Sequence, residues 1–595
     1  MPHPTLSLTL VLSLALGLAG APLAAGTTGK DKPADAGTGA AVDKPAAAGA
    51  AAAGMELPEG AGAYLAARQA AGSNDFAEAA RWYDIALQSD PQNPNLLEGD
   101  VTAYLAMGNL ATAAKLAQSL ATTGSKSEIG AMTLLGDAAQ RGDFAAILKA
   151  QGDGASIGQL MDNLVTAWSE VGTGKMSDAT ATFDKIIATP GMQAFGLYHK
   201  ALALAQTGDF EGAQKLMSDP RAAGVLSLRR GVLAEAEILS QLERAPEAVA
   251  LIDKNFGPVL DDGMAELRRK LSAGEPIPFD VARTPQEGLA EAFYTLATVL
   301  ADQADDTFTL VNVRIATALR PDHTEAKLMV ARILDKLQQF DLAVAAYAAI
   351  PEGDPAYVSA VVGQAGASME AGKLDDAVTL LKTLAEKRPA DGGVLTAYGD
   401  ALRRQDHCDT AVVVYGQAIA LITQPHAGDW PLYYRRGGCE YAQNNWPAAE
   451  ADYKAALALA PNEPRLLNEL GYGYVDRGEH LDAALAMIQK AVAAAPDQGY
   501  IIDSLAWAYF RLGRYQDAVV PQEKASLLMP VDAVVTDHLG DVYWMVGRHR
   551  EAQYQWHRAL SFKPEDKDAT RIRRKLEVGL DQVLKEEKVS GSNGG

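Results

Sequence analysis

The sequence predicts an all-α protein, a right-handed α-solenoid of about 14 helix–turn–helix repeats arranged in two arrays. Three observations predict this fold. Of the 595 residues, 48% are hydrophobic, which excludes a disordered chain, and one compact core would be unusual at this length. Small and aromatic residues recur at fixed offsets. Prolines keep the same period, with separations of 34, 34, 36, 36, 35, 34 and 34 residues between Pro321, Pro355, Pro389, Pro425, Pro461, Pro496, Pro530 and Pro564.

The N-terminus is typical of an exported protein. Residues 1–25 contain no Asp, Glu, Lys or Arg, and the apolar run 6–18 is shorter than the roughly 20 residues of a membrane span. Small residues before Gly26 suit a signal peptidase, although no Lys or Arg precedes the apolar run. We predict a cleavable signal peptide over 1–25; the alternative is a buried apolar helix. Residues 26–58, rich in Ala, Gly and Pro, are predicted to be a disordered linker.

The repeat itself is interpreted as two helices joined by a short turn. Each proline follows an alanine-rich run, where a residue without an N–H can end a helix at little cost. In the last full unit the recurring positions are Gly540, Tyr543, Ala552, Trp556 and Ala559. Small residues let the paired helices approach, and aromatic residues fill the space between pairs. Turn glycines that tolerate left-handed backbone are predicted at Gly208, Gly372, Gly513 and Gly547.

The period is looser in the N-terminal half and is broken once. We predict an N-terminal array over 59–270, a joint rich in proline and glycine over 271–288, and a C-terminal array over 289–565. A charged helix over 566–588 is predicted to cap the exposed end of the stack, and 589–595 to be a disordered tail. The basic residues of that last helix are interpreted as part of a solvated cap, with a docking site as the alternative.

Motifs for catalysis, cofactors and metals are missing from the sequence. It contains no phosphate-binding loop, no HExxH helix and no GxSxG elbow, and the glycine pairs at 60–62 and 471–473 are interpreted as helix packing positions. Two cysteines and nine scattered histidines do not suit a structural metal site. A net charge of −22 disfavours nucleic acid as a partner. We predict no enzyme activity, no cofactor and no metal; an enzyme with its site in the irregular region 130–290 is the remaining alternative.

The two cysteines lie in neighbouring repeats. Cys408 is predicted at the start of a second helix and Cys439 late in the next first helix, so the two ends should meet. An oxidising compartment would permit a disulfide there. Two buried thiols are the equally weighted alternative.

A partner-binding groove is predicted along the first helices of the last repeats, on the side that does not face the second helices. Aromatic anchors mixed with amide and charged groups suit an extended peptide or a partner helix. The alternative for Trp507 and Trp544 is core between repeats, and His538 with Asp541 could instead be a ligand pair. The predicted groove residues are Asn468, Tyr472, Asp503, Trp507, Phe510, Arg511, His538, Asp541 and Trp544.

The repeat resembles the tetratricopeptide repeat (TPR). Residues 467–564 are further similar to exported TPR proteins of proteobacteria, on the segments LNELGYGYVDRGEHLDAALAMIQKAVAAAPDQGYIIDSLAWAYFRLGRYQDAV and DHLGDVYWMVGRHREAQYQWHRAL. That family includes outer-membrane TPR lipoproteins that bind a periplasmic carboxyl-terminal processing protease and present cell-wall hydrolases to it. This sequence lacks their acylated cysteine.

The resemblance implies a scaffold or adaptor in the cell envelope. We predict a periplasmic protein without a transmembrane helix in its mature chain, whose groove binds protein or peptide partners. A carboxyl-terminal processing protease and cell-wall hydrolases are the partners that the resemblance suggests. The alternative function is an assembly factor for an envelope biogenesis, secretion or polysaccharide-export complex.

Overall fold

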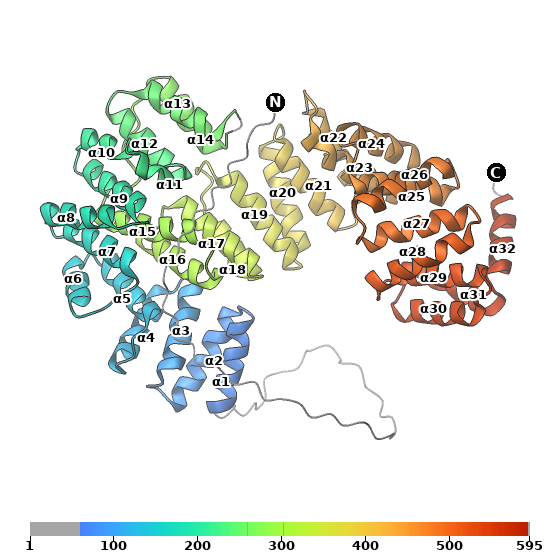
Figure 1. Ribbon diagram of the computed structural model, residues 1–595, viewed down its shortest axis with the longest axis horizontal. Coiled ribbons are helices and arrows are strands. Elements are labelled where there is room, and N and C mark those ends of the chain that lie inside the picture. Colours follow the sequence, from blue (N-terminus) through green and yellow to red (C-terminus); the bar gives the residue numbers. More distant parts are fainter. Residues whose placement is uncertain (1–59, 259, 302, 593–595) are drawn as a thin grey trace. The chain divides into compact units, whose positions relative to one another are not determined.

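The computed structural model describes residues 60–258, 260–301 and 303–592, without the side chains of 588–592. The predicted signal peptide and linker lie outside these residues. The described chain consists of helices with no strand, which confirms the predicted all-α repeat fold. It forms two compact units, one ending at Ala356 and one beginning at Tyr357 (Figure 1).

The N-terminal unit is built mainly of antiparallel helical hairpins. Its elements are α1 Gly60–Gly72, α2 Phe76–Ser89, α3 Pro94–Ala106, α4 Leu110–Thr122, α5 Glu128–Gln140, α6 Phe144–Gly152, α7 Gln159–Gly172, α8 Met176–Ala188, α9 Gln193–Gln206, α10 Phe210–Met217, η1 Pro220–Ala222, α11 Ala223–Leu226, α12 Arg229–Gln241, α13 Ala245–Phe256, α14 Asp262–Ser272, α15 Pro285–Leu300, α16 Asp306–Leu319, α17 Thr324–Lys336 and α18 Phe340–Ala348.

The C-terminal unit continues the same hairpin pattern. Its elements are α19 Tyr357–Glu370, α20 Leu374–Lys387, α21 Gly392–Arg404, α22 Cys408–Ala420, η2 Ala427–Asp429, α23 Trp430–Ala442, α24 Trp446–Leu459, α25 Pro464–Arg477, α26 Leu481–Ala494, α27 Gly499–Arg511, α28 Tyr515–Leu528, α29 Ala533–Met545, α30 His549–Ser561, α31 Asp566–Val578 and α32 Leu580–Ser592.

Short local signals make the hairpin turns. All four predicted turn glycines have positive φ: 88° at Gly208, 76° at Gly372, 73° at Gly513 and 85° at Gly547. At the first of these, Asp209 follows at once and caps the next helix, because its side chain accepts the backbone N–H of residue 212 at 2.8 Å. The glycine ends one helix, and the aspartate begins the other.

Two helices of the N-terminal unit pack against the first helices of its own hairpins. Helix α15 contacts α7 and α9, and α16 contacts α3 and α5 (Figure 1). Gly288 on α15 leaves room for the ring of Trp168, which a Cβ atom there would overlap. On α16, the Arg314 guanidinium Nε donates to the carbonyl of Ala106 at 2.9 Å. The inner face of this unit, formed by α3, α5, α7 and α9, is therefore covered by the same chain.

This packing moves the boundary between the two units. The sequence places the division at the joint 271–288, and the structure does lack helix over 273–284. The compact units nevertheless divide after Ala356. The reason is that α15 and α16, which follow the joint, add their contacts to the N-terminal hairpins rather than to the C-terminal ones.

The C-terminal end differs from the single predicted cap helix over 566–588. Two helices, α31 and α32, are separated by Gly579, which has a φ of 81°. A Cβ atom at this glycine would lie 2.5 Å from the Trp544 ring, so the chain turns tightly over that indole. The second helix continues to Ser592, into the predicted tail 589–595.

Candidate functional site

The inner face of the C-terminal unit is formed by α19, α21, α23, α25, α27 and α29, the first helices of its hairpins. The repeat period places equivalent residues along it. Tyr434, Asn468, Asp503 and Asp537 follow one another at intervals of 34, 35 and 34 residues and share one register position. The nine predicted groove residues lie on α25, α27 and α29 of this face.

Where Trp507 of α27 meets α29, this face is packed shut. Trp507 is only 8% exposed, and its ring stacks on Phe510 at 4.7 Å and on His538 at 4.0 Å between centroids. His538 Nδ1 lies 2.9 Å from a carboxylate oxygen of Asp503, which also accepts the side-chain amide of Gln522. Burial opposes the charged form of His538, but Asp503 outweighs it, and the imidazole pKa is raised. The burial of Trp507 agrees with the alternative of core between repeats.

The predicted residues of α29 contact the terminal helices. Lys575 of α31 is fully buried, and its ammonium lies 2.6 Å from Asp537 and 2.7 Å from Asp541. The indole N–H of Trp556 donates to Asp541 at 2.9 Å, and that of Trp544 donates to Asp581 at 2.8 Å. The buried lysine thus joins the cap to the last hairpin. His538 contacts Asp503, whereas Asp541 contacts Trp556 and Lys575.

The open part of the inner face lies over α23, α25 and α27. Of the predicted residues, Tyr472 and Arg511 are partly exposed here, and the Arg511 guanidinium donates to the backbone carbonyl of Asp476 at 2.8 Å. Sequence reasoning missed four partly exposed neighbours. The proline register could have found them, because they stand on first helices, beside the positions that we predicted. They are Tyr434, Tyr441, Glu469 and Tyr500.

We call Tyr434, Tyr441, Glu469, Tyr472 and Tyr500 the tyrosine–glutamate cluster. Burial raises the pKa of all four phenols, and the negative charge of Glu469 raises each of them further. For Tyr434 the resulting pKa is about 12. Burial also raises the pKa of Glu469 itself, although the neighbouring Asn468 amide opposes that shift. The cluster therefore combines neutral phenols with one desolvated carboxyl group.

The two cysteines are joined in the C-terminal unit. Cys408, the first residue of α22, and Cys439, in α23, form a disulfide with a Cα–Cα distance of 5.0 Å. The bond ties the second helix of one hairpin to the first helix of the next. Cys439 stands on α23, the helix that also carries Tyr434 and Tyr441 of the tyrosine–glutamate cluster.

A second group of titratable side chains lies in the N-terminal unit. Glu291 of α15 is fully buried, pairs with Arg230 of α12 at 2.8 Å and accepts the Tyr198 hydroxyl of α9 at 2.9 Å. Burial alone would raise the pKa of Glu291, but Arg230 and His323 outweigh it and hold it well below its usual range. Each charge is thus compensated within the network, which fixes α15 to α9 and α12.

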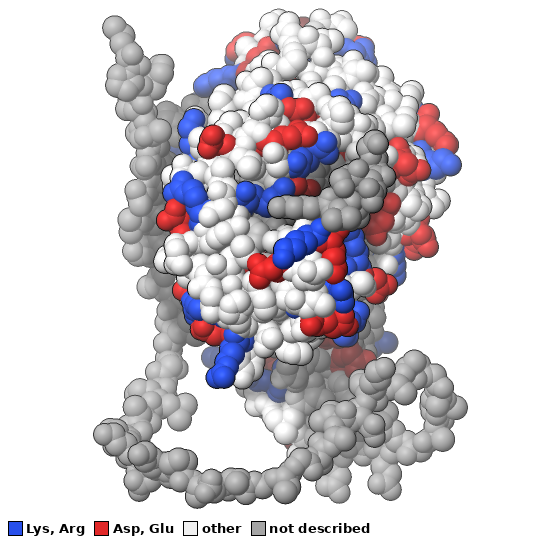
Figure 2. Space-filling view, turned by 90° about the vertical axis from the view of Figure 1, so that its right-hand side faces the viewer, with Lys and Arg blue, Asp and Glu red and all other residues white. Residues whose placement is uncertain are grey.

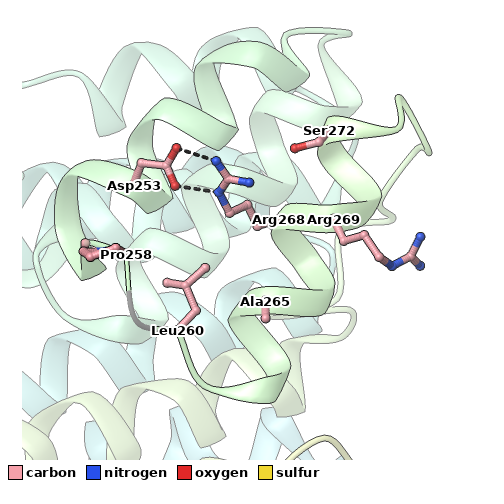
Figure 3. Close-up of a pocket in the computed structure, with 8 residues that line it drawn as sticks. Asp253, Pro258, Leu260, Ala265, Arg268, Arg269 and Ser272 are labelled. Carbon is pink, nitrogen blue, oxygen red and sulfur yellow. Dashed lines mark hydrogen bonds and ion pairs between the residues drawn. The ribbon is translucent and has the colours of Figure 1, made fainter. Parts of the chain in front are cut away.

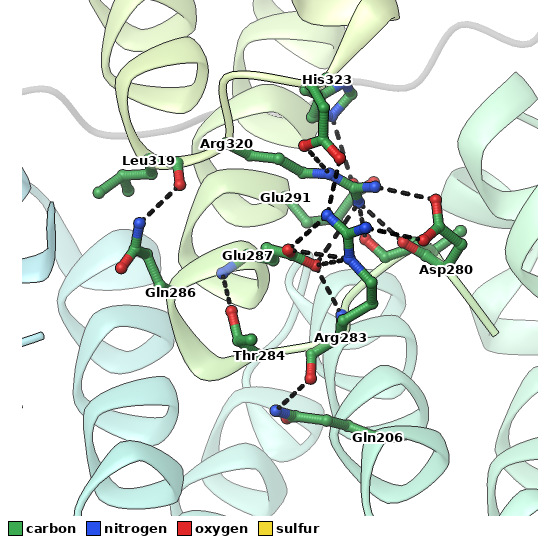
Figure 4. Close-up of polar contacts among 12 residues, drawn as sticks. Gln206, Asp280, Arg283, Thr284, Gln286, Glu287, Glu291, Leu319, Arg320 and His323 are labelled. Atoms are coloured by element: carbon green, nitrogen blue, oxygen red, sulfur yellow. Dashed lines mark hydrogen bonds and ion pairs between the residues drawn. The ribbon is translucent and has the colours of Figure 1, made fainter.

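The joint is held to α15 and to the end of α16 by polar contacts (Figure 4). Arg320, at the end of α16, donates to the carbonyls of Asp280 and Val281 at 2.9 and 2.8 Å, and Arg283 pairs with Glu287 at 2.7 Å. The cavity beside this network, lined in part by Tyr198 and Arg230, measures only about 70 Å³. These contacts position the joint; they leave little room for a ligand.

A wider hollow of about 840 Å³ lies between α13 and α14 (Figure 3). It falls in the region where the enzyme alternative would need an active site. Its lining acid and base are bonded to each other, because Arg268 donates to Asp253 at 2.6 and 2.9 Å. Arg269 pairs with Glu266 outside the lining. The hollow therefore presents no converging set of unpaired titratable groups among the described residues.

Surface charge, hydropathy and possible metal ligands of the described residues add three findings. On the face drawn in Figure 2, Lys and Arg side chains stand beside Asp and Glu side chains. Within the described part of the chain, no helix combines the length and apolar character needed to cross a bilayer. The same residues contain no group of three or more His, Cys, Asp or Glu placed to hold a metal ion.

The hairpins and their register define a helical-repeat protein. Residues 434–499 match the tetratricopeptide-repeat family. Within this segment the chain resembles tetratricopeptide repeats, a class whose stacked helix pairs generally mediate protein–protein interaction. The matched residues include most of the tyrosine–glutamate cluster and the whole of α25.

Solved structures with similar hairpin arrays were also found. The chain is 16% identical to one in the crystal structure of the APC/C hetero-tetramer Cut9–Hcn1, with a TM-score of 0.38, covering 88% of this chain and 97% of that one. A tetratricopeptide repeat protein from Parabacteroides merdae is 15% identical, with a TM-score of 0.36 and coverage of 43% and 98%. YrrB, described as a TPR protein with an unusual peptide-binding site, is 16% identical, with a TM-score of 0.26 and coverage of 33% and 97%. No curated protein matches the sequence.

Proposed function

We propose that this protein is a non-enzymatic scaffold or adaptor that holds a protein or peptide on the inner face of its C-terminal unit. One observation carries the proposal. The inner face of the N-terminal unit is covered by α15 and α16, whereas α23, α25 and α27 keep partly exposed aromatic side chains on theirs. Tyrosines of this kind, with an apolar ring and a polar tip, are favoured at protein interfaces.

Site-specific photo-cross-linking in the full-length protein tests the proposal. A photoreactive residue in place of Tyr472 should form adducts with a partner in the cells that produce the protein. The same residue in place of Tyr554, which is 73% exposed on the second helix α30, is the matched position away from the inner face. Mass spectrometry then identifies the adduct. Equal labelling from both positions would contradict the proposal.

A blocking substitution makes the test specific to this face. Gly438 shares the register position of Tyr472 and Trp507, and the nearest atom to a Cβ there is the Tyr453 hydroxyl at 4.0 Å. Gly438→Leu should fold and abolish the adduct at Tyr472. Gly366→Leu is the control, because it has the same register position on α19, where a Cβ atom meets nothing within 4 Å. Loss of the adduct in both variants, or in neither, would move the partner elsewhere.

We also propose that the protein acts in the cell envelope after export. The N-terminal 25 residues support this proposal by their lack of charge and their apolar run, and the resemblance to exported TPR adaptors makes a processing protease or a cell-wall hydrolase the first partner to test. Cell fractionation with N-terminal sequencing should find the protein in the periplasm, beginning at Gly26. A cytoplasmic chain that retains Met1 would overturn the location.

A further inference from the structure

We infer that the tyrosine–glutamate cluster binds a lysine or arginine side chain of the partner, so that the segment held on the inner face is basic. This inference rests on the proposed function and specifies the chemistry of its ligand. The cluster is reachable, because Tyr434, Tyr441, Glu469, Tyr472 and Tyr500 are all partly exposed. The rings offer faces for a cation, and the carboxylate offers the opposite charge.

Glu469 lacks a cation of its own. Among the described residues no Lys, Arg or His forms an ion pair with it, and its pKa is raised by burial without any opposing basic side chain. The nearby arginines pair with other acids, although the charge of Arg465 also acts on Tyr434 and Tyr500. Arg465 pairs with Glu463 at 2.9 Å, and Arg435 pairs with Asp400 at 3.3 Å. A desolvated carboxylate without a counter-charge gains more from a bound cation than an exposed one does.

A second group in the same place is also left without a partner. Asn468, the residue before Glu469, is only 3% exposed, and its Oδ1 atom accepts no hydrogen bond from the described residues. It shares the register position of Asp503 and Asp537, whose side chains both contact neighbouring helices across the inner face.

The last hairpin shows that carboxylates on a first helix of this unit can hold a lysine, although its acids stand at other register positions than Glu469. Two repeats further on, Asp537 and Asp541 hold the ammonium of Lys575, which also lies 5.8 Å from the centroid of the Trp556 ring. That lysine comes from α31, the first helix after the last hairpin. At the tyrosine–glutamate cluster an acid and aromatic rings are also present, but α27, the first helix of the next hairpin, contains Tyr500 and no lysine. The partner supplies the missing cation.

Selection from a random 12-residue peptide library on the full-length protein tests the inference. The bound peptides should be enriched in Lys and Arg. Replacing the enriched basic residue of the strongest binder by Gln should weaken its binding at least tenfold, as measured by fluorescence polarisation. This change is made in the peptide, so its result does not depend on whether a protein variant folds.

The matching change in the protein is Glu469→Gln, which keeps the shape and removes the charge. It should weaken the basic peptide about tenfold and leave the Gln-substituted peptide unchanged. Asp482→Asn, on the second helix α26, removes an exposed charge away from the cluster and should have no effect. Circular dichroism checks that both variants keep the helical fold.

The outcomes separate this inference from the proposed function. If the enriched peptides are acidic or neutral and Gly438→Leu abolishes their binding, the basic ligand is overturned and the binding face is kept. Basic peptides that bind Glu469→Gln as tightly as the unmodified protein would also overturn the inference. If no peptide is enriched and the adduct at Tyr472 is absent, both proposals fail.

Discussion

The two units use the same hairpin in opposite ways on their inner faces. In the N-terminal unit, α15 and α16 cover the first helices, and a buried ion network around Glu291 fixes them in place. In the C-terminal unit, α27 and α29 pack tightly, but α23 and α25 keep half-exposed tyrosines and an acid without a cation. The comparison teaches that an inner face of first helices is not by itself a binding face. The face has to be left uncovered.

The largest expected effect is on the closure of the N-terminal unit. Glu291→Gln removes the charge that compensates buried Arg230, and an uncompensated buried ion costs about 3–5 kcal/mol. We expect the N-terminal unit to lose about that much unfolding free energy in urea, with early hydrogen exchange of α15. Arg268→Gln, which breaks an exposed pair with Asp253, should cost only about 0–1 kcal/mol. Equal losses would contradict the role of the network in closure.

A slightly smaller loss of unfolding free energy is expected when the disulfide is removed, and it should be confined to the C-terminal unit. Replacing Cys408 by Ser and Cys439 by Ala opens a link between residues 31 positions apart. The chain-entropy treatment gives a loss of about 3–4 kcal/mol. Unfolding monitored by hydrogen exchange should show this loss in α21–α24 and leave the N-terminal unit unchanged. Mass spectrometry of the unmodified protein should find no free thiol.

The contact between α15 and α7 gives a third test of the closed face. Gly288→Val would place two methyl groups where the Trp168 ring lies, and overpacking of this kind costs about 1–3 kcal/mol. The same substitution at Gly152 is the control, because a Cβ atom there meets nothing within 4 Å. Thermal unfolding of both variants gives the comparison. If Gly288→Val is no worse than the control, α15 is held more loosely than described.

The last expected effect is a pH dependence of stability, and it concerns a buried acid on α3. Burial, together with the nearby Asp84 carboxylate, raises the pKa of Asp100 from 3.8 to about 8. Since the folded protein holds this proton more tightly than the unfolded chain, its contribution to stability is complete below about pH 4 and is lost as the pH rises through 8. Asp100→Asn should remove this loss, so that the variant loses less unfolding free energy than the unmodified protein between pH 5 and pH 9. Thermal unfolding at pH 5 and pH 9 checks it, with exposed Asp153→Asn as the control.

The sequence could predict the hairpins because their signals are local. Prolines and turn glycines such as Gly513 and Gly547 act within a few residues, and the structure confirms their left-handed backbone. The closure by α15 could not be predicted in the same way. It depends on contacts between Gly288 and Trp168, which are 120 residues apart, and neither residue differs by type from an ordinary repeat position.

The site was predicted only in part for a related reason. The proline register gives Tyr472 and Trp507 the same position on successive first helices, but it does not distinguish an exposed position from a covered one. Trp507 is covered because Phe510 of the same helix and His538 of α29 stack on its ring. Glu469 is open because no neighbouring helix supplies a base. Both outcomes depend on the contents of adjacent repeats, which a single-repeat pattern does not contain.

The covering of the N-terminal inner face has a consequence for folding kinetics. A simple repeat stack unfolds by stepwise fraying, since each unit contacts only its neighbours. Helices α15 and α16 join segments far apart in the chain, which raises contact order and couples the early hairpins into one cooperative block. The N-terminal half should therefore fold more slowly than the C-terminal half and unfold in a single step.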